Sequence, residues 1–136
     1  MADSINQDER RTLSVLAFLF FRMGMDERAR GIYEALAELS APNSSDWRFA
    51  HAGMAAVELE LGRGRASLEH LKKAIQGGPL ATKEAALYLL KAQALWQMGR
   101  RDEAQLARDE YLRLAAPQVT KTDVGAKAPT QIVEPK

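Results

Sequence analysis

Three glycines recur at nearly equal intervals along the chain, and this period constrains the fold more than any other feature. They are 38 and 37 residues apart, at Gly24, Gly62 and Gly99. Prolines follow them at a matching interval, 37 and 38 residues apart, at Pro42, Pro79 and Pro117. Internal similarity at a fixed period of roughly 20–50 residues indicates a stack of repeated structural units. The sequence therefore predicts three repeats, at about 8–42, 46–79 and 82–117.

Each glycine is flanked by features of a turn between two helices. Small residues lie seven positions before and five positions after it, at Ala17, Ala55 and Ala92 and at Ala29, Ser67 and Ala104. Glycine ends a helix at low cost because it tolerates the left-handed conformation. The acidic pairs Asp26–Glu27 and Asp102–Glu103 then begin the next helix, where carboxylates interact well with the helix dipole. We interpret these pairs as helix-start residues and not as acid–base catalysts.

The pattern predicts six helices and no strand, which makes the chain all-α. Their expected ranges are about 5–23, 26–40, 46–61, 64–77, 82–98 and 101–115. Ser4 with Gln7 forms a candidate capping box for the first helix, Ser44, Ser45 or Asp46 a candidate cap for the third, and Thr82 one for the fifth. Apolar residues recur at helical spacing, as in Leu13, Leu16, Ala17 and Phe20.

Charge and cysteine content exclude several classes of function. The chain has 19 Lys and Arg against 18 Asp and Glu, for a formal net charge of +1. Nucleic-acid binders normally carry a basic stripe that displaces counterions from phosphates, so this balance argues against nucleic acid as a partner. Cysteine is absent, which rules out disulfides and thiolate chemistry and fits a reducing cytosol.

The apolar run at 13–21 superficially resembles a signal sequence. Acidic residues before it and Arg22 directly after it disagree with that interpretation. The run is also shorter than the roughly 18–20 residues that a membrane span needs. A core helix is the better interpretation.

No catalytic or cofactor site can be identified. His51 and His70 fall on different predicted helices without further ligand spacing, so no metal is expected. The glycines at 62–64 and 77–78 are turn signals and form no phosphate loop. No spacing singles out a nucleophile. We therefore expect a protein that is not an enzyme and that has no cofactor.

After Pro117 the composition changes. Residues 118–136 contain four larger aliphatic residues, no aromatic residue, and interruptions at Gly125, Pro129 and Pro135. Such a segment cannot bury enough apolar surface to offset the entropy of ordering. We predict a folded domain over 1–117 and a flexible tail over 118–136.

The glycine, acidic pair and alanine, with the small residue before them and the proline after them, resemble the tetratricopeptide repeat. The resemblance covers about residues 8–117. It implies a short right-handed solenoid whose first helices line a concave groove. The second repeat departs from the family pattern, because His51 and Glu58 stand where large apolar residues are usual and Gly64 is expected to loosen a helix start. Lys91 and Arg108 depart from the pattern in the third repeat.

Two segments resemble the three-repeat chaperones of bacterial type III secretion, most closely the YscY (SctY) group. They are the apolar first helix followed by residues 24–29, and the run 94–104 followed by Tyr111 and Leu112. The resemblance implies a virulence-associated chaperone in the bacterial cytoplasm. Its client would be a small secreted or export component like YscX (SctX).

The expected partner-binding residues follow from helical offsets relative to the small packing residues. They are Ser14, Phe18, Phe21, Arg22, Phe49, Leu59, Leu89, Gln93 and Trp96, within a wider set that adds Arg11, Ala52, Ala56, Glu60, Ala86 and Gln97. Four aromatic rings would share one groove, although Phe18 and Phe21 fit the core equally well and Trp96 favours the groove. Ser14 and Phe18 replace the Lys and Asn of carboxylate-clamp repeats. An amphipathic helix in an apolar groove is therefore the expected mode.

Rival functions stay open at this stage. The chain could be a general repeat adaptor in a stable complex, without a secreted client. A small enzyme or a nucleic-acid binder is a third class, which salt-dependent binding to DNA or RNA would reveal. An apolar groove also predicts self-association into a homodimer when the client is missing.

Overall fold

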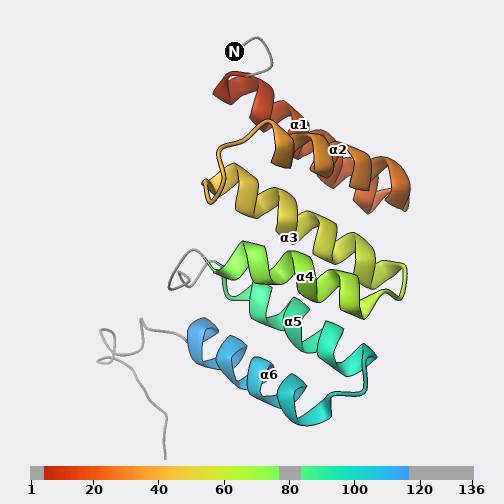
Figure 1. The fold of residues 1–136 in the computed structure, drawn as a ribbon, viewed down its shortest axis with the longest axis vertical. Coiled ribbons are helices and arrows are strands. Elements are labelled where there is room, and N and C mark those ends of the chain that lie inside the picture. Colours follow the sequence, from red (N-terminus) through yellow and green to blue (C-terminus); the bar gives the residue numbers. More distant parts are fainter. Residues whose placement is uncertain (1–4, 77–83, 117–136) are drawn as a thin grey trace, which may run out of the picture.

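A computed structural model describes residues 5–76 and 84–116, and these residues form six helices without a strand (Figure 1). The helices are α1 (Gln7–Arg22), α2 (Asp26–Glu38), α3 (Ser45–Glu60), α4 (Gly64–Ile75), α5 (Ala86–Gln97) and α6 (Arg101–Ala115). The predicted all-α class is confirmed. Pro79, Pro117 and the segment expected to be a tail lie outside the described residues.

The three periodic glycines end α1, α3 and α5 in the left-handed conformation. Their φ angles are 77° at Gly24, 75° at Gly62 and 77° at Gly99. Two backbone hydrogen bonds close the turn after α1: the Gly24 N–H donates to Phe21 O at 3.0 Å, and the Met25 N–H donates to Phe20 O at 2.9 Å. Equivalent bonds follow α3 and α5. The period therefore reflects one turn used three times.

The helix starts differ in part from the prediction. Asn6, and not Ser4, caps α1: its side chain accepts from the Glu9 N–H at 2.8 Å, and its own N–H donates to Glu9 Oε1 at 3.0 Å. The capping box predicted at Ser4 and Gln7 is thus wrong. The expected cap at Ser44 is present, since its Oγ accepts from Trp47 N–H at 3.2 Å. α5 begins at Ala86, later than predicted, and Thr82 lies outside the described residues.

Consecutive helices pack against one another along the chain and form a stack with α1 and α2 at one end and α6 at the other (Figure 1). α3 also contacts both α1 and α5, so these three helices touch in series. No helix among the described residues is both long and apolar enough to cross a membrane.

The core is divided between the two ends of the stack. One cluster comprises Ala17, Ala29, Tyr33, Met54 and Val57, and a second comprises Leu68, Ala94, Leu95, Ala104 and Ala107. Most of the small residues around the glycines are fully buried, as predicted, which lets the helices approach closely. Leu16 is an exception to the predicted core: 40% of it is exposed, because it points away from the helices that α1 contacts.

Two glycines inside helices permit close packing. Gly64 is the first residue of α4, and a Cβ on it would lie 2.8 Å from the Ala94 carbonyl oxygen, so this residue also has a packing role that the sequence did not show. A Cβ on Gly53 would lie 2.3 Å from the Tyr33 ring. Both residues are small because a neighbouring helix occupies the space of a side chain.

Candidate functional site

An open groove of about 520 Å³ lies between the end of α3, one face of α5 and the first half of α6. Its lining residues are Leu59, Glu60, Leu89, Ala92, Gln93, Trp96, Gln97, Ala104, Gln105 and Arg108. The interior is mostly aliphatic and aromatic, and the polar residues lie among and beside these side chains. Such a composition is typical of a recognition groove.

The groove presents apolar surface that the described residues leave uncovered. Trp96 is 58% exposed and Leu89 is 37% exposed. The Arg101 guanidinium lies 4.9 Å from the centre of the Trp96 ring, which holds one side of the indole and leaves the remainder open. Large apolar side chains with this much exposure, placed together in a hollow, indicate a contact surface for another molecule.

Packing on the opposite side of α5 fixes the direction of Trp96. Ala94 and Leu95 are buried in the second core cluster, so the following residue must point outward on a helix with 3.6 residues per turn. The Gln97 side chain donates from Nε2 to the Leu59 carbonyl oxygen at 3.1 Å and links α5 to the end of α3. The two helices that form this part of the groove are therefore in direct contact.

Four of the nine predicted binding residues line this groove, and the other five are not among its lining residues. Leu59, Leu89, Gln93 and Trp96 line the groove, together with Glu60 and Gln97 of the wider predicted set. The remaining predicted residues, Ser14, Phe18, Phe21, Arg22 and Phe49, lie on α1 and α3 outside its lining.

Of the four aromatic rings expected in one groove, Trp96 lines this one and Phe18, Phe21 and Phe49 do not. Phe18 and Phe49 are exposed on α1 and α3, and the Arg22 guanidinium lies 5.8 Å from the centre of the Phe18 ring. Phe21 packs against the first core cluster, which settles its open assignment in favour of the core. The Ser14 hydroxyl donates to the Arg10 carbonyl oxygen at 3.1 Å within its own helix.

Three lining residues on α6 lie outside the predicted set. They are Ala104, Gln105 and Arg108. The prediction assigned the groove to the first helix of each pair, so the second helix of the last pair was not considered. Arg108 carries a sequence signal, because it interrupts a position at which packing residues are common.

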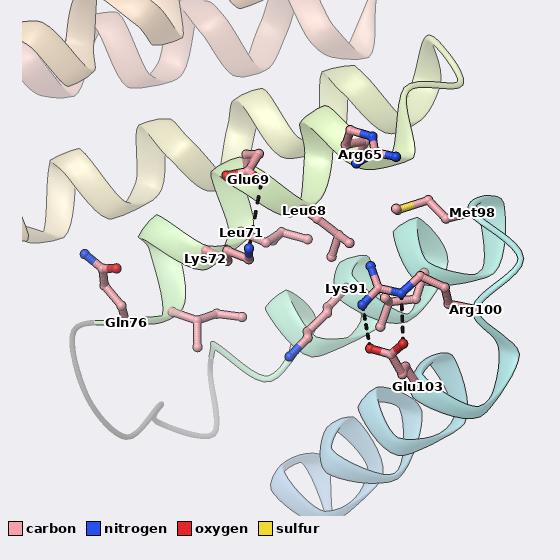
Figure 2. A pocket seen from close by; sticks show the side chains of 12 residues that line it. Arg65, Leu68, Glu69, Leu71, Lys72, Gln76, Lys91, Met98, Arg100 and Glu103 are labelled. Carbon is pink, nitrogen blue, oxygen red and sulfur yellow. Dashed lines mark hydrogen bonds and ion pairs between the residues drawn. The ribbon is translucent and has the colours of Figure 1, made fainter.

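A second cavity of about 610 Å³ lies between α4, α5 and α6 (Figure 2). Its rim carries charges that pair with one another on their own helices. Lys72 Nζ lies 3.8 Å from Glu69 Oε2, and Arg100 donates to both carboxylate oxygens of Glu103 at 2.7 and 2.8 Å. Arg65 and Lys91 add positive charge to the rim, and none of the predicted binding residues lines this cavity.

The smaller groove is the better candidate site, because the floor of the larger cavity is already buried. In the larger cavity Leu71 is 1% exposed and Leu95 is 2% exposed, so a ligand would remove little further apolar surface from water. In the α3–α5–α6 groove, Trp96 and Leu89 have much of their apolar surface exposed to water. Burial of apolar area is the main favourable term in association, so the groove with more exposed apolar area has more to gain.

Two histidines on different helices, 19 residues apart in the sequence, lie in contact. His51 Nδ1 and His70 Nδ1 lie 3.0 Å apart between α3 and α4, and the Trp47 ring packs edge-on against His51 with centroids 4.5 Å apart. Burial, with His70 and Lys73 nearby, lowers the pKa of His51 to about 4. One proton shared between two neutral rings explains the short distance. The described residues contain no group of three or more His, Cys, Asp or Glu side chains that could hold a metal.

Glu58 is the other buried polar group, and it explains a departure from the repeat pattern. Its side chain is almost fully buried, with Oε2 3.0 Å from Arg30 Nε and Oε1 3.2 Å from Arg63 Nη1. The carboxylate therefore links α2, α3 and the turn before α4. We assign Glu58 a structural role, because each of its carboxylate oxygens forms an ion pair with an arginine.

Comparison with known proteins does not assign the chain to a family. No family model matches the chain, and no curated protein is significantly similar to it.

Proposed function

We propose that this chain is a tetratricopeptide-like chaperone of bacterial type III secretion, which acts in the cytoplasm without catalysis or a cofactor. It would hold an amphipathic helix of a small secreted or export-apparatus protein, like YscX (SctX), and keep that client soluble. The observation that carries the proposal is the open α3–α5–α6 groove, in which Trp96 and Leu89 remain exposed to water.

The repeated two-helix architecture supports this choice. Three helix pairs share the same glycine turn, and small residues lie between them. Such pairs resemble tetratricopeptide repeats, which commonly serve as scaffolds that bind other protein chains. The local likeness of residues 24–29 and 94–104 to the YscY (SctY) group supports the more specific assignment.

The spacing of the exposed apolar residues suits a helical ligand. Leu89 and Trp96 are seven residues apart on α5, which corresponds to about 10.5 Å along the helix axis. A ligand helix with apolar residues at i, i+3 or i+4, and i+7 presents anchors over the same length. We therefore expect the client segment to be an amphipathic helix of at least two turns.

Charges at the groove also constrain the client. Glu60 at the end of α3 and Arg108 on α6 lie among the lining residues and carry opposite charges. A ligand helix with a basic residue on one flank and an acidic residue on the other would match both of them. Complementary charges of this kind contribute more to orientation and specificity than to affinity.

Co-purification tests the proposal. The full chain is co-expressed with any small secretion components that are encoded beside it, and captured proteins are identified by mass spectrometry. We expect one of these components to copurify and the Trp96→Glu variant to bind it at least about 30-fold more weakly, as for loss of a buried aromatic anchor. Leu106→Glu is the matched control, because Leu106 is exposed on α6 outside the groove.

The outcomes separate the proposal from its rival. Failure of every co-encoded secretion component to bind would refute the secretion role. If a non-secreted protein bound instead, and Trp96→Glu weakened that binding, the groove would belong to a general adaptor. Equal loss of binding in Trp96→Glu and Leu106→Glu would contradict the assignment of the groove itself.

A further inference from the structure

The larger cavity, between α4, α5 and α6, carries more positive than negative charge around its rim (Figure 2). The charged lining residues are Arg65, Lys72, Lys91 and Arg100 against Glu69 and Glu103. This is an excess of two positive charges, whereas the whole chain has a formal net charge of +1. Charged residues directly beside the lining residues in the sequence do not cancel the excess, because Lys73 and Arg101 are positive and Asp102 alone is negative.

Two of the four cations at the rim have no carboxylate partner. Both rim carboxylates are already held in the ion pairs described above. Arg65 and Lys91 form no ion pair with the described residues, and Lys91 Nζ lies 5.9 Å from the centre of the Tyr88 ring. The hydrogen bond from Arg100 lowers the pKa of Glu103, and Lys91 adds a smaller contribution. The cavity therefore keeps positive charge that the described residues do not neutralise.

The cavity offers a ligand more charge than apolar surface. Its floor residues Leu71 and Leu95 are already buried, and only Ile75 and Met98 among its large apolar residues keep part of their surface exposed. Little stabilisation can therefore come from burying apolar area. A cleft lined by an excess of one charge attracts ligands of the opposite charge, so the ligand that suits this cavity is an anion.

The spread of the charges favours an elongated ligand over a single anion. Arg65 and Lys72 are seven residues apart on α4, which corresponds to about 10.5 Å along the helix axis. Lys91 and Arg100 come from α5 and from the start of α6 (Figure 2). One phosphate or one carboxylate cannot contact cations so far apart. An extended peptide advances about 3.3 Å per residue, so three or four residues cover the same length.

Single-stranded nucleic acid is the other elongated anion, and the lining of the cavity does not suit it. Proteins that bind single strands combine positive charge with aromatic side chains on which the bases stack. None of the described aromatic side chains lines this cavity. The partly exposed aliphatic residues Ile75 and Met98 suit the side chains of a peptide instead.

We infer that the α4–α5–α6 cavity is a second protein-binding site, which takes an extended acidic segment of a partner chain. The Arg65 guanidinium can bind one carboxylate with two parallel hydrogen bonds, and Lys91 can bind a second carboxylate as a point charge. The cavity shares no lining residue with the candidate groove, which presents apolar surface to a helix. The inference is therefore independent of the proposed function, and both sites can be filled at once.

Fluorescence anisotropy of the full chain with short labelled probes tests this inference. The acidic probe is a peptide of about eight residues that alternates glutamate and alanine, and its counterpart has lysine in place of glutamate. Oligouridine of about eight nucleotides is the third probe. In about 50 mM salt we expect the acidic peptide to bind with a dissociation constant below about 1 mM, and the other two at least about tenfold more weakly. Binding should weaken in about 300 mM salt, because salt screens exposed charges.

Charge reversal at the unpartnered cations shows whether the peptide binds in the cavity. Arg65→Glu and Lys91→Glu should each raise the dissociation constant of the acidic peptide at least about fivefold, and Arg65→Gln should give a smaller loss. Arg28→Glu is the matched control, because it makes the same charge change at an exposed residue of α2 outside the cavity. No binding of the acidic peptide, tighter binding of either other probe, or equal loss in Arg28→Glu would overturn the inference.

NMR of the wild-type chain locates the bound peptide without a substitution. Ile75 and Met98 line the cavity, whereas Trp96 lines the candidate groove. We expect the methyl signals of Ile75 and Met98 to shift when the acidic peptide is added, while the indole N–H signal of Trp96 stays in place. Shifts confined to Trp96 would place the peptide in the groove and contradict a second site, without affecting the proposed function.

Discussion

Acidification from about pH 7.5 to about pH 5 should destabilise the chain through the buried pair of His51 and His70. The two Nδ1 atoms lie 3.0 Å apart, so they can share one proton but repel when both rings are charged. Burial, His70 and Lys73 together lower the pKa of His51 to about 4, and burial is the largest of several influences that lower the pKa of His70. Lys73 and Arg30 also disfavour a charged His70, whereas Glu58 and Glu34 favour it.

The sign follows from which state binds protons first. In the unfolded chain His51 titrates near about 6.5, whereas in the folded chain its pKa is about 4. The unfolded state therefore gains protons first as the pH falls, and the stability present above about pH 6.5 is lost progressively down to about pH 4. Between pH 6.5 and 5 the loss for His51 is at most about 2 kcal/mol, and screening by water around the pair reduces it to about 1 kcal/mol.

Urea unfolding followed by far-ultraviolet circular dichroism measures this loss at the two pH values. His51→Gln is the control, since it removes the titrating ring and keeps the carboxylates that also titrate in this range. We expect the free energy of unfolding to fall by about 1 kcal/mol more in the wild type than in the variant. An equal fall in both proteins would refute the reasoning, and so would an NMR titration that gave His51 a pKa at or above 6.5.

Two further predictions concern packing, each measured as a free energy of unfolding in urea. Gly53→Ala should lower the free energy of unfolding by about 2–3 kcal/mol, because the new Cβ would lie 2.3 Å from the Tyr33 ring. Gly31→Ala in α2 is the control and should raise it by about 0.5–1 kcal/mol, because open space surrounds this position. Equal effects of the two substitutions would mean that α2 and α3 pack differently. Glu58→Gln should lower the free energy of unfolding by about 2–4 kcal/mol, because it removes the buried negative charge that lies 3.0 Å from Arg30. An unchanged free energy of unfolding would show that the carboxylate is dispensable.

Local features of the fold could be predicted from the sequence. The glycine turns depend on a single residue type with a special conformation, so Gly24, Gly62 and Gly99 mark the ends of α1, α3 and α5 directly. The start of α1 could not be resolved, because Ser4 with Gln7 and Asn6 with Glu9 have the same capping-box spacing. Only the observed geometry distinguishes two boxes that lie two residues apart.

Features that depend on contacts between helices could not be predicted. His51 and His70 lie 19 residues apart, and no local pattern shows that their rings meet. The need for Gly64 arises from the Ala94 carbonyl oxygen on another helix. The exposure of Leu16 could not be predicted for a related reason: apolar spacing shows that a residue can be buried, but among the described residues α1 lies at one end of the stack.

The candidate groove was predictable on its α5 side and not on its α6 side. Helical offsets from Ala92 placed Leu89 and Trp96 outward, because both residues follow from the period of one helix. The contribution of Arg108 depends on how far α6 reaches around α5, which is a property of packing. Trp96 on α5 lines the groove, whereas Phe18 on α1 is not among its lining residues.

The fluorescence of Trp96 tests the central claim most directly, namely that a client helix fills the α3–α5–α6 groove. Trp47 is the only other tryptophan, so Trp47→Phe leaves Trp96 as the single reporter. When a secretion component that copurifies with the chain is added, we predict a shift of the emission to shorter wavelength and protection from acrylamide, because the ring passes from water into an apolar contact. Tight binding that left the emission and the quenching of Trp96 unchanged would contradict the account.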